Sequence, residues 1–173
     1  MNISVIKCPD ISNGPGCRVA VFVSGCPIHC KECFNKAIWD YHAGQYMDDK
    51  LIDHITDLMS YDYIEGFTLL GGEPMAPLNV DGTARLIHAI REAYPDKSIW
   101  VYSGYTYDEL NRRKSEYVRY VLDTADVLVD GPFVSEKHDI TLKFRGSSNQ
   151  RIIDLRETQK EKRLVLVDDS TFA

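Results

Sequence analysis

The sequence contains no long apolar run and no targeting segment. No window approaches the roughly 18 apolar residues that a membrane-spanning helix needs. The first residues, MNISVIKCPD, lack the basic stretch followed by an apolar one that marks a secretory signal. These absences argue against a membrane or secreted protein, and we expect a cytoplasmic one.

An excess of basic residues is also missing. The chain carries a formal net charge of −6, and its lysines and arginines are scattered. Proteins that bind nucleic acid usually present a basic face to the phosphate backbone. The composition therefore disfavours a nucleic-acid partner and favours a small molecule or a protein.

Nothing in the sequence divides the chain, since we find no repeat, low-complexity tract or linker. A chain of 173 residues with 44% hydrophobic content can bury a core without disulfides or a structural metal. We expect one domain over residues 1–173, with roughly residues 156–173 as a C-terminal extension whose structure the sequence leaves open.

Apolar runs alternate with amphipathic stretches along the chain. Helical spacing and helix-start signals predict helices behind Asp48 and Asp49, from Asp81 to the stop at Pro95, and from a Thr106–Glu109 capping box onward to about residue 122. β-rich runs predict strands at residues 18–24, 66–70, 98–103 and 126–133, with further candidates at 140–146, 150–155 and 163–167. This alternation is typical of βαβ units, so the predicted fold class is α/β with parallel strands.

Four unusual segments each directly follow one of the first four predicted strands. They are the loop that begins at Cys26, the Gly71–Pro74 segment (GGEP), the SGY after the third strand and the DGPF after the fourth. Ligands of parallel α/β folds bind at the carboxyl ends of the strands. The sequence therefore predicts that the four segments form one site.

Cysteine is scarce, but three of the five cysteines lie within CPIHCKEC, at Cys26, Cys30 and Cys33. Clustered cysteines in a reducing compartment indicate metal or redox chemistry. A structural zinc site normally takes two separated cysteine pairs, and a four-iron cluster normally takes four thiolates. Three thiolates on such a cluster would leave one iron open to a substrate, as in catalytic metal sites.

Other interpretations of the cysteines stay open at this point. Cys8 or Cys17 could complete a structural zinc site or a fully ligated electron-transfer cluster, since both lie shortly before the loop. The cysteines could also be ordinary buried thiols. His29 could ligate a metal, although an outer or exposed position suits it better.

The GGEP segment supplies a second chemical signal. Glycines such as Gly71 and Gly72 let a backbone approach a ligand closely, and the carboxylate of Glu73 could accept hydrogen bonds from an ammonium group. A lone Gly-Gly is more often a turn, so the signal depends on its place after the strand that follows the cysteine loop.

C-x3-C-x2-C after one strand and GGEP after the next resemble the radical S-adenosylmethionine enzymes. DISNGPGCRVAVFVSGC, CFNKAIW, VYSGYTYDEL, VLVDGPF and FRGSSNQRIIDL, between about Asp10 and Leu155, narrow the resemblance to the activating proteins of anaerobic ribonucleoside-triphosphate reductases. The resemblance implies a shortened, incomplete parallel (βα) barrel. It also implies a [4Fe-4S] cluster on Cys26, Cys30 and Cys33, with S-adenosylmethionine contacts from Glu32, Cys33, Phe34, Gly71, Gly72 and Glu73.

The activity implied by this resemblance is radical chemistry on a protein. The reduced cluster would cleave S-adenosylmethionine, and the 5'-deoxyadenosyl radical would generate a glycyl radical on the large subunit of an anaerobic ribonucleoside-triphosphate reductase. A one-electron donor such as flavodoxin or ferredoxin would reduce the cluster. The alternatives are an activase for another glycyl radical enzyme, of the formate-lyase type, a small radical enzyme acting on a metabolite, and a non-enzymatic electron carrier.

Several other polar residues have ordinary explanations. Asp126 and Asp130 bracket a strand and are better read as turn formers than as cation ligands. Residues 102–105 could line a ribose site or simply form a strand end and a helix cap. Arg145 and the following GSSNQ receive no chemical role.

Overall fold

The computed structural model describes residues 1–172 and contains one mixed seven-stranded sheet. The strand order is β3-β1-β2-β4-β5-β6-β7. The strands are β1 (Asn2–Asp10), β2 (Arg18–Val23), β3 (Gln45–Tyr46), β4 (Gly66–Gly71), β5 (Ser98–Tyr102), β6 (Val127–Asp130) and β7 (Arg151–Asp154). The α-helices are α1 (Asp49–Leu58), α2 (Val80–Ala93), α3 (Tyr107–Asn111), α4 (Glu116–Thr124) and α5 (Leu155–Glu161).

The centre of the sheet has the predicted βαβ arrangement. β2, β4, β5 and β6 are parallel neighbours, and all four coincide with predicted strands. The α/β class is therefore confirmed. The expectation of purely parallel strands is wrong at the edges, where β1 and β3 on one side and β7 on the other pair antiparallel.

β1 was not predicted, and its burial pattern explains why. It lies outside the parallel strands, and buried and more exposed residues alternate along it. Lys7 and Pro9 interrupt its apolar character, so the segment does not read as a buried strand.

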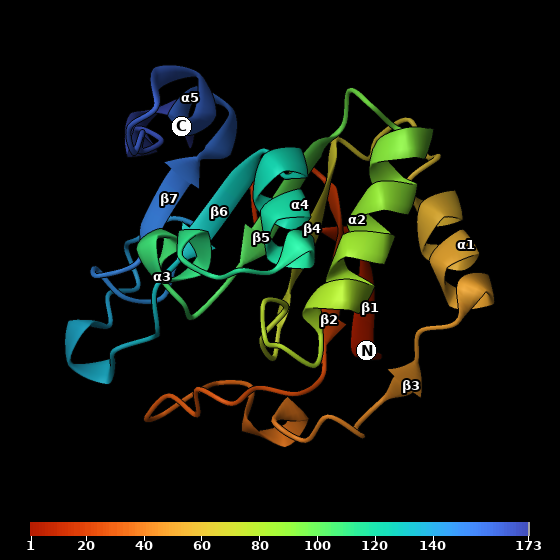
Figure 1. Ribbon diagram of the computed structural model, residues 1–173, viewed down its shortest axis with the longest axis horizontal. Coiled ribbons are helices and arrows are strands. Elements are labelled where there is room, and N and C mark those ends of the chain that lie inside the picture. Colours follow the sequence, from red (N-terminus) through yellow and green to blue (C-terminus); the bar gives the residue numbers. More distant parts are fainter. Residues whose placement is uncertain (173) are drawn as a thin grey trace.

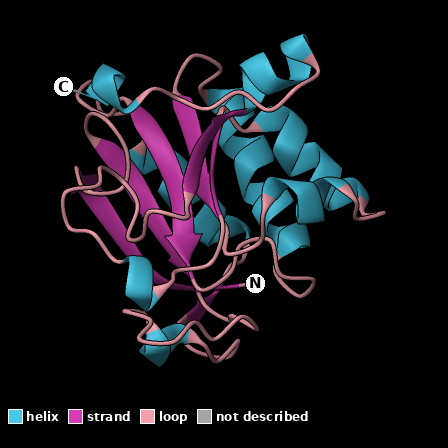
Figure 2. Cartoon of the chain, turned by 90° about the vertical axis from the view of Figure 1, so that its left-hand side faces the viewer, coloured by secondary structure: helices cyan, strands magenta, loops and turns pink. Residues whose placement is uncertain are grey.

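The helices pack on one face of the sheet (Figure 2). α1, α2 and α4 lie side by side across it, as Figure 1 shows, and their apolar faces meet alternate strand residues such as Val21, Leu69 and Ile99 in the main core. The opposite face, here called the inner face, carries a smaller cluster built on Trp100, Val129 and Ile152. Loops cover the inner face instead of helices.

Helix-start signals were read correctly, but one helix boundary was missed. The Thr106–Glu109 capping box is present at α3. The helical region expected to run to about residue 122 is broken into α3 and α4, because Ser115 begins a new helix by accepting a hydrogen bond from the Val118 N–H.

Of the three late strand candidates, only 150–155 contains a named strand, β7. Residues 140–146 form turns, and 163–167 contribute only an isolated bridge between Leu166 and Ile153. The charged stretch after β7 forms α5, with Leu155 and Thr158 buried.

Beyond α5 the chain returns to the inner face. The ring of Phe172 packs against Trp100 and Phe144 at centroid distances of 5.8 and 5.1 Å. Asp169 pairs with Arg145. The final described residues therefore cover the smaller apolar cluster.

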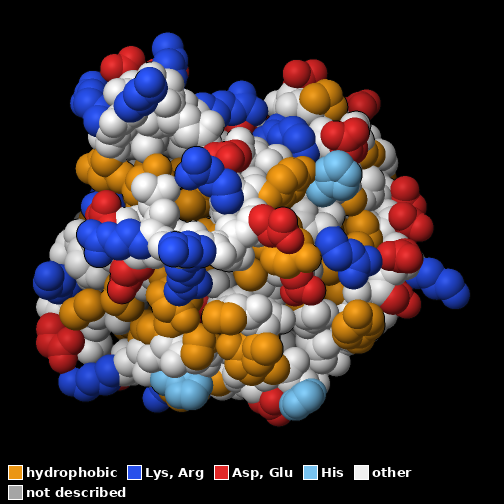
Figure 3. All heavy atoms as spheres, in the orientation of Figure 1, with side chains coloured by type: hydrophobic (Ala, Val, Ile, Leu, Met, Phe, Trp, Pro, Cys, Tyr) orange, Lys and Arg blue, Asp and Glu red, His pale blue; other side chains and the backbone are white. Residues whose placement is uncertain are grey.

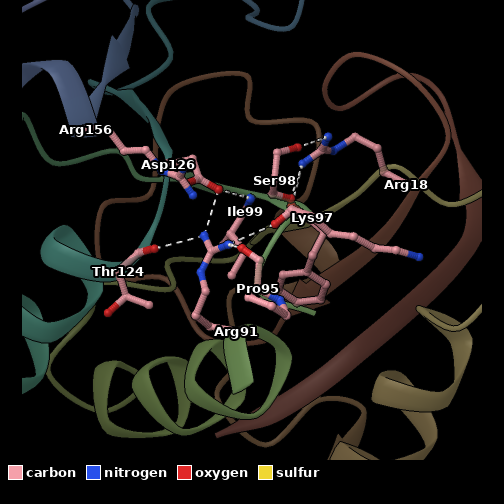
Figure 4. A network of polar contacts seen from close by, with 10 residues as sticks. Arg18, Arg91, Pro95, Lys97, Ser98, Ile99, Thr124, Asp126 and Arg156 are labelled. Carbon is pink, nitrogen blue, oxygen red and sulfur yellow. Dashed lines mark hydrogen bonds and ion pairs between the residues drawn. The ribbon is translucent and has the colours of Figure 1, made fainter. Parts of the chain in front are cut away.

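Arg18 lies fully buried at the amino ends of the parallel strands. Its guanidinium donates to the Thr68 hydroxyl, to the Ser98 hydroxyl and to three backbone carbonyls, those of Pro15, Phe67 and Ser98. Burial lowers its pKa to about 10. Figure 4 shows this arginine beside a second network centred on Asp126, so this end of the sheet is held by polar contacts.

The surface of the helical side shows no single-sign face. Basic and acidic side chains are interspersed over it in Figure 3, in agreement with the scattered charges of the sequence. Within residues 1–172, no helix has the length and apolar character to cross a membrane.

Candidate functional site

A cavity of about 400 Å³ lies at the carboxyl ends of the parallel strands. All four segments predicted to converge contribute to its wall: the cysteine loop after β2, Gly71–Glu73 after β4, Tyr102–Gly104 after β5 and Gly131 after β6. The prediction that these segments lie on one edge is therefore confirmed.

Most of the candidate site residues line this cavity. The lining includes Cys26, Cys30, Cys33, Phe34, Gly71, Gly72 and Glu73. Glu32 does not belong to it: its side chain is exposed, and its backbone is left-handed with φ 58°. Its neighbour Phe34 is 75% exposed, yet its ring packs against Phe133 at 5.3 Å.

The cysteine loop is closed at its base by two backbone hydrogen bonds. The Gly25 N–H donates to the Ile38 carbonyl at 2.8 Å, and the Cys26 N–H donates to the Trp39 carbonyl at 3.0 Å. The ring of His29 stacks on Trp39 at 4.2 Å, which explains its position without a metal. The loop is therefore a defined structure.

The three thiols of this loop differ in exposure. Cys26 is buried, whereas Cys30 and Cys33 are half-buried. Burial raises the pKa of the Cys26 and Cys30 thiols, although backbone N–H groups nearby, including that of His29 at Cys26, act in the opposite direction. A metal group that bound these thiols as thiolates would displace their protons, so its binding would depend on pH.

Cys8 and Cys17 lie elsewhere. Both are partly buried and pack against the main core on the helical side, and neither lines the cavity. In the structure they therefore do not join the three loop cysteines as further ligands.

The donor set of the cavity suits a cluster better than a single ion. Over residues 1–172, no three side chains of His, Cys, Asp or Glu are grouped closely enough to hold one metal ion. A four-iron cluster is a larger body, so its thiolate ligands stand farther apart than those of one ion. Trp39, which lines the cavity, also has a buried indole N–H that finds no acceptor among the described residues. The three cysteines of the cavity thus fit a cluster better than a single ion.

Glu73 is the buried carboxyl of the cavity, with an exposed fraction of 1%. One oxygen accepts hydrogen bonds from the Met75 N–H and the Ser103 hydroxyl at 2.9 and 2.8 Å, and the other accepts from the Gly104 N–H at 2.7 Å. Burial raises its pKa to about 7, against the opposing effect of these hydrogen bonds and of Arg113. The site therefore holds an oriented carboxyl with one proton to lose near neutral pH.

The two glycines before Glu73 are required by close backbone packing. A Cβ on Gly72 would lie 2.5 Å from the Gly25 carbonyl oxygen, and Gly71 has φ 108°. The Gly72 N–H donates to the Val23 carbonyl and the Glu73 N–H to the Gly25 carbonyl, both at 2.8 Å. The glycines therefore bring the GGEP segment against the base of the cysteine loop.

Sequence reasoning missed the part of the wall contributed by distant loops. Ser12, Asn13, Phe144, Arg145 and Gln150 also line the cavity. These residues lie in the motifs DISNG and FRGSSNQ, but their residue types alone indicate no chemical role. Hydrogen bonds hold both loops against the sheet, from the Thr68 hydroxyl of β4 to the Asn13 carbonyl and from the Tyr102 hydroxyl of β5 to the Phe144 carbonyl.

The two discounted aspartates have structural roles. Asp126 pairs with Arg91 and Arg156 and accepts a hydrogen bond from the Ile99 N–H, as Figure 4 shows in part. Asp130 pairs with Arg151 and accepts from the Tyr107 N–H. Neither aspartate lines the cavity.

Comparisons with known proteins agree with this site. Residues 12–153 match the family model described as a 4Fe-4S single cluster domain. The anaerobic ribonucleoside-triphosphate reductase-activating protein of Escherichia coli (strain K12) is 42% identical over 151 residues, which cover 85% of this chain and 94% of that protein.

Two further relatives carry the same name. The relative from Haemophilus influenzae is 40% identical over 145 residues, which cover 83% of this chain and 91% of the relative. The relative from Enterobacteria phage T4 is 37% identical over 153 residues, which cover 88% of this chain and 93% of the relative. The fold, the cavity and the family match define an α/β protein with a single 4Fe-4S cluster domain. Within that class, the chain belongs to the family of anaerobic ribonucleoside-triphosphate reductase-activating proteins.

Proposed function

We propose that the protein is the activating enzyme of an anaerobic ribonucleoside-triphosphate reductase and that it binds S-adenosylmethionine beside a [4Fe-4S] cluster. The observation that carries the proposal is a single cavity lined by all three cysteines of the C-x3-C-x2-C loop and by the buried carboxyl of Glu73. The names and high identity of the relatives support the choice of partner.

In this proposal Cys26, Cys30 and Cys33 hold three irons and leave the fourth open to the cofactor. A reduced cluster held by these residues would supply the one electron needed to cleave S-adenosylmethionine into methionine and a 5'-deoxyadenosyl radical, and that radical would take a hydrogen atom from a glycine Cα of the reductase. A flavodoxin or ferredoxin type of protein is the proposed electron donor.

The chain's own residues bind and orient the cofactor. The Glu73 carboxylate accepts hydrogen bonds from the amino group of the methionine moiety, and its orientation is fixed by Ser103, Gly104 and Met75. Phe34, packed on Phe133, gives the cavity an apolar wall.

A sheet that does not close into a full barrel suits a protein substrate. The sheet begins at β3 and ends at β7 without closing. We propose that this arrangement is a shortened, incomplete barrel in one domain, and that the cavity beside the cysteine loop admits the glycine-bearing loop of the reductase. Water must be excluded when that loop docks, because a reactive radical has to be protected from side reactions.

Cofactor cleavage is the experiment that tests the enzymatic proposal. Anaerobically reconstituted protein, supplied with S-adenosylmethionine and a chemical reductant, is expected to produce 5'-deoxyadenosine. An electron carrier with a fully ligated cluster would produce none, and that result would contradict the proposal.

The choice of partner needs a separate measurement. Incubation with an anaerobic ribonucleotide reductase is expected to give a glycyl radical signal in electron paramagnetic resonance. A signal that appears only with a formate-lyase type partner would redirect the proposal to another glycyl radical enzyme.

Replacement of one proposed cluster ligand tests the site itself. Cys30→Ala should abolish both the cluster absorbance and 5'-deoxyadenosine formation, because two thiolates cannot replace three. Cys17→Ala is the matched control, since Cys17 packs against the core outside the cavity and should leave iron content unchanged. Cleavage that survives Cys30→Ala would overturn the ligand assignment.

A further inference from the structure

Asn79 occupies the position where helix α2 begins, yet its side chain does not cap the helix. It is 1% exposed, and no side-chain cap hydrogen bond forms at this N-cap. Asparagine at an N-cap normally accepts a hydrogen bond from the backbone one turn into the helix, which stabilises the helix. The side chain of Asn79 gives up this role for other contacts.

Those contacts join the two segments that build the cavity. The Asn79 amide nitrogen lies 3.0 Å from the Ser24 carbonyl oxygen and 3.2 Å from that of Gly25, at the base of the cysteine loop. It also lies 3.0 Å from the Glu73 carbonyl oxygen. Three acceptors surround one amide nitrogen, so only the NH2 end of the side chain can face them.

Among residues 1–172, no other side chain donates hydrogen bonds to both the base of the cysteine loop and the GGEP segment. The neighbouring Thr83, one turn later on α2, donates to the Pro74 carbonyl at 2.9 Å and to the Met1 sulfur at 3.5 Å, and makes no hydrogen bond to the cysteine loop. Backbone hydrogen bonds also link the two segments, from Glu73 N–H to Gly25 and from Gly72 N–H to Val23. The Asn79 amide therefore joins that backbone pairing to the N-cap of helix α2.

We propose that Asn79 is a positioning residue, which sets the distance between the cluster-bearing loop and the Glu73 carboxyl. A cofactor that contacts both sides of the cavity requires this distance to be fixed, because binding geometry tolerates errors of only about 0.5 Å. Asn79 does not line the cavity, so it acts through the two segments that it joins. The inference rests on the proposed function for its ligand, but the contacts themselves do not depend on it.

Hydrogen exchange of the metal-free protein tests the positioning directly. In Asn79→Ala, protection of the Glu73 and Cys26 amides is expected to fall about tenfold relative to amides of the main core, the loss that corresponds to roughly one net hydrogen bond. Thr83→Val is the matched control, since it removes a single hydrogen bond between α2 and the GGEP segment but none to the cysteine loop. It should leave protection at Cys26 within about twofold of wild type.

Cofactor binding provides the second measurement. In anaerobically reconstituted protein, Asn79→Ala should keep its iron content and bind S-adenosylmethionine about tenfold more weakly, while Thr83→Val stays within about twofold. Asn79→Ser retains one donor and should be intermediate, at about threefold, which keeps the test available if the alanine variant does not fold.

The proposal is overturned if Asn79→Ala leaves both local protection and binding within twofold of wild type, or if Thr83→Val reproduces both losses. The result is separable from the proposed function. If the wild-type protein fails to bind S-adenosylmethionine, the proposed function fails, while the exchange data on the metal-free chain still decide whether Asn79 positions the two segments.

Discussion

At the scale of single residues, Glu73 shows how burial gives an ordinary side chain unusual chemistry. Its three hydrogen bonds would favour the charged carboxylate, but removal from water favours the neutral acid and dominates. The result is a pKa of about 7 in the metal-free chain. The carboxyl changes charge in the pH range where the protein is expected to work.

This shift predicts a pH dependence of stability. The folded-state pKa of about 7 lies above the ordinary value of 4.5, so the folded chain keeps a proton on Glu73 that the unfolded chain releases. Its contribution to the free energy of unfolding is therefore fully present below about pH 4.5 and is lost as pH rises to about 7. Glu73→Gln cannot titrate and should lack this component.

The effect can be measured by urea unfolding of both metal-free proteins between about pH 5 and pH 8, a range that includes the folded-state pKa of about 7. Wild type should lose stability relative to Glu73→Gln as pH rises. A difference between the two proteins that stays constant over the range would show that Glu73 has an ordinary pKa.

At the same scale, the sequence predicted which residues of the GGEP segment matter but not why. Gly72 was expected to admit a ligand, and the structure adds a second reason, the Gly25 carbonyl that a Cβ would strike. The contact joins residues far apart in the chain, so no local pattern reveals it. Asn79 was missed for the same reason, because an asparagine before a helix ordinarily indicates a cap.

At the scale of elements, the critical feature is the pairing that continues β2 and β4 beyond their ends. The hydrogen bonds from Gly72 to Val23 and from Glu73 to Gly25 extend the parallel ladder into the site. The cysteine loop and the GGEP segment therefore share one rigid base.

Gly72→Ala should disturb this base. The added methyl group would meet the backbone oxygen of Gly25 at 2.5 Å, and overpacking of this kind costs about 1–3 kcal/mol of unfolding free energy. At Gly104 a Cβ would instead meet the flexible tip of Ile28, also at 2.5 Å. Gly104→Ala is therefore the control, and urea unfolding should show a smaller loss for it. Equal losses would contradict the backbone explanation.

Helices and strands with a strong local pattern were predicted well. The four parallel strands, α1 with its Asp48 cap and α2 before Pro95 follow directly from apolar periodicity and helix-end signals. Two elements that the sequence did not predict have physical causes. β1 is an outer strand with weak apolar character, and α5 is a charged segment that becomes helical because Leu155 and Thr158 are buried in the folded chain.

At the scale of the whole molecule, the two faces of the sheet are covered differently. Helices bury the main core, whereas loops and the last described residues cover the inner face. Sequence alone could not show this, because the 163–172 segment contacts residues elsewhere in the chain, among them Ile152, Trp100 and the 143–145 loop, and no local pattern indicates such contacts.

Phe172 tests the contribution of this cover. Phe172→Ala removes ring contacts with Trp100 and Phe144 and should lower the free energy of unfolding by about 1–2 kcal/mol, as expected for a partly buried aromatic pair. Ile140→Ala provides the control, since Ile140 is 88% exposed and should change stability by less than about 0.5 kcal/mol. Equal urea midpoints for wild type and Phe172→Ala would show that the terminal segment does not stabilise the fold.

The closed base of the cysteine loop has a consequence for how the site can vary. Because Gly25 and Cys26 are hydrogen-bonded to Ile38 and Trp39, the chain enters and leaves the loop at one fixed point. We therefore expect that loop residues other than the three cysteines can change without moving the strands on either side. We therefore expect that the loop could be grafted onto another protein. That protein would need a parallel strand end and a neighbouring segment that packs as closely as Gly72 packs on the Gly25 carbonyl.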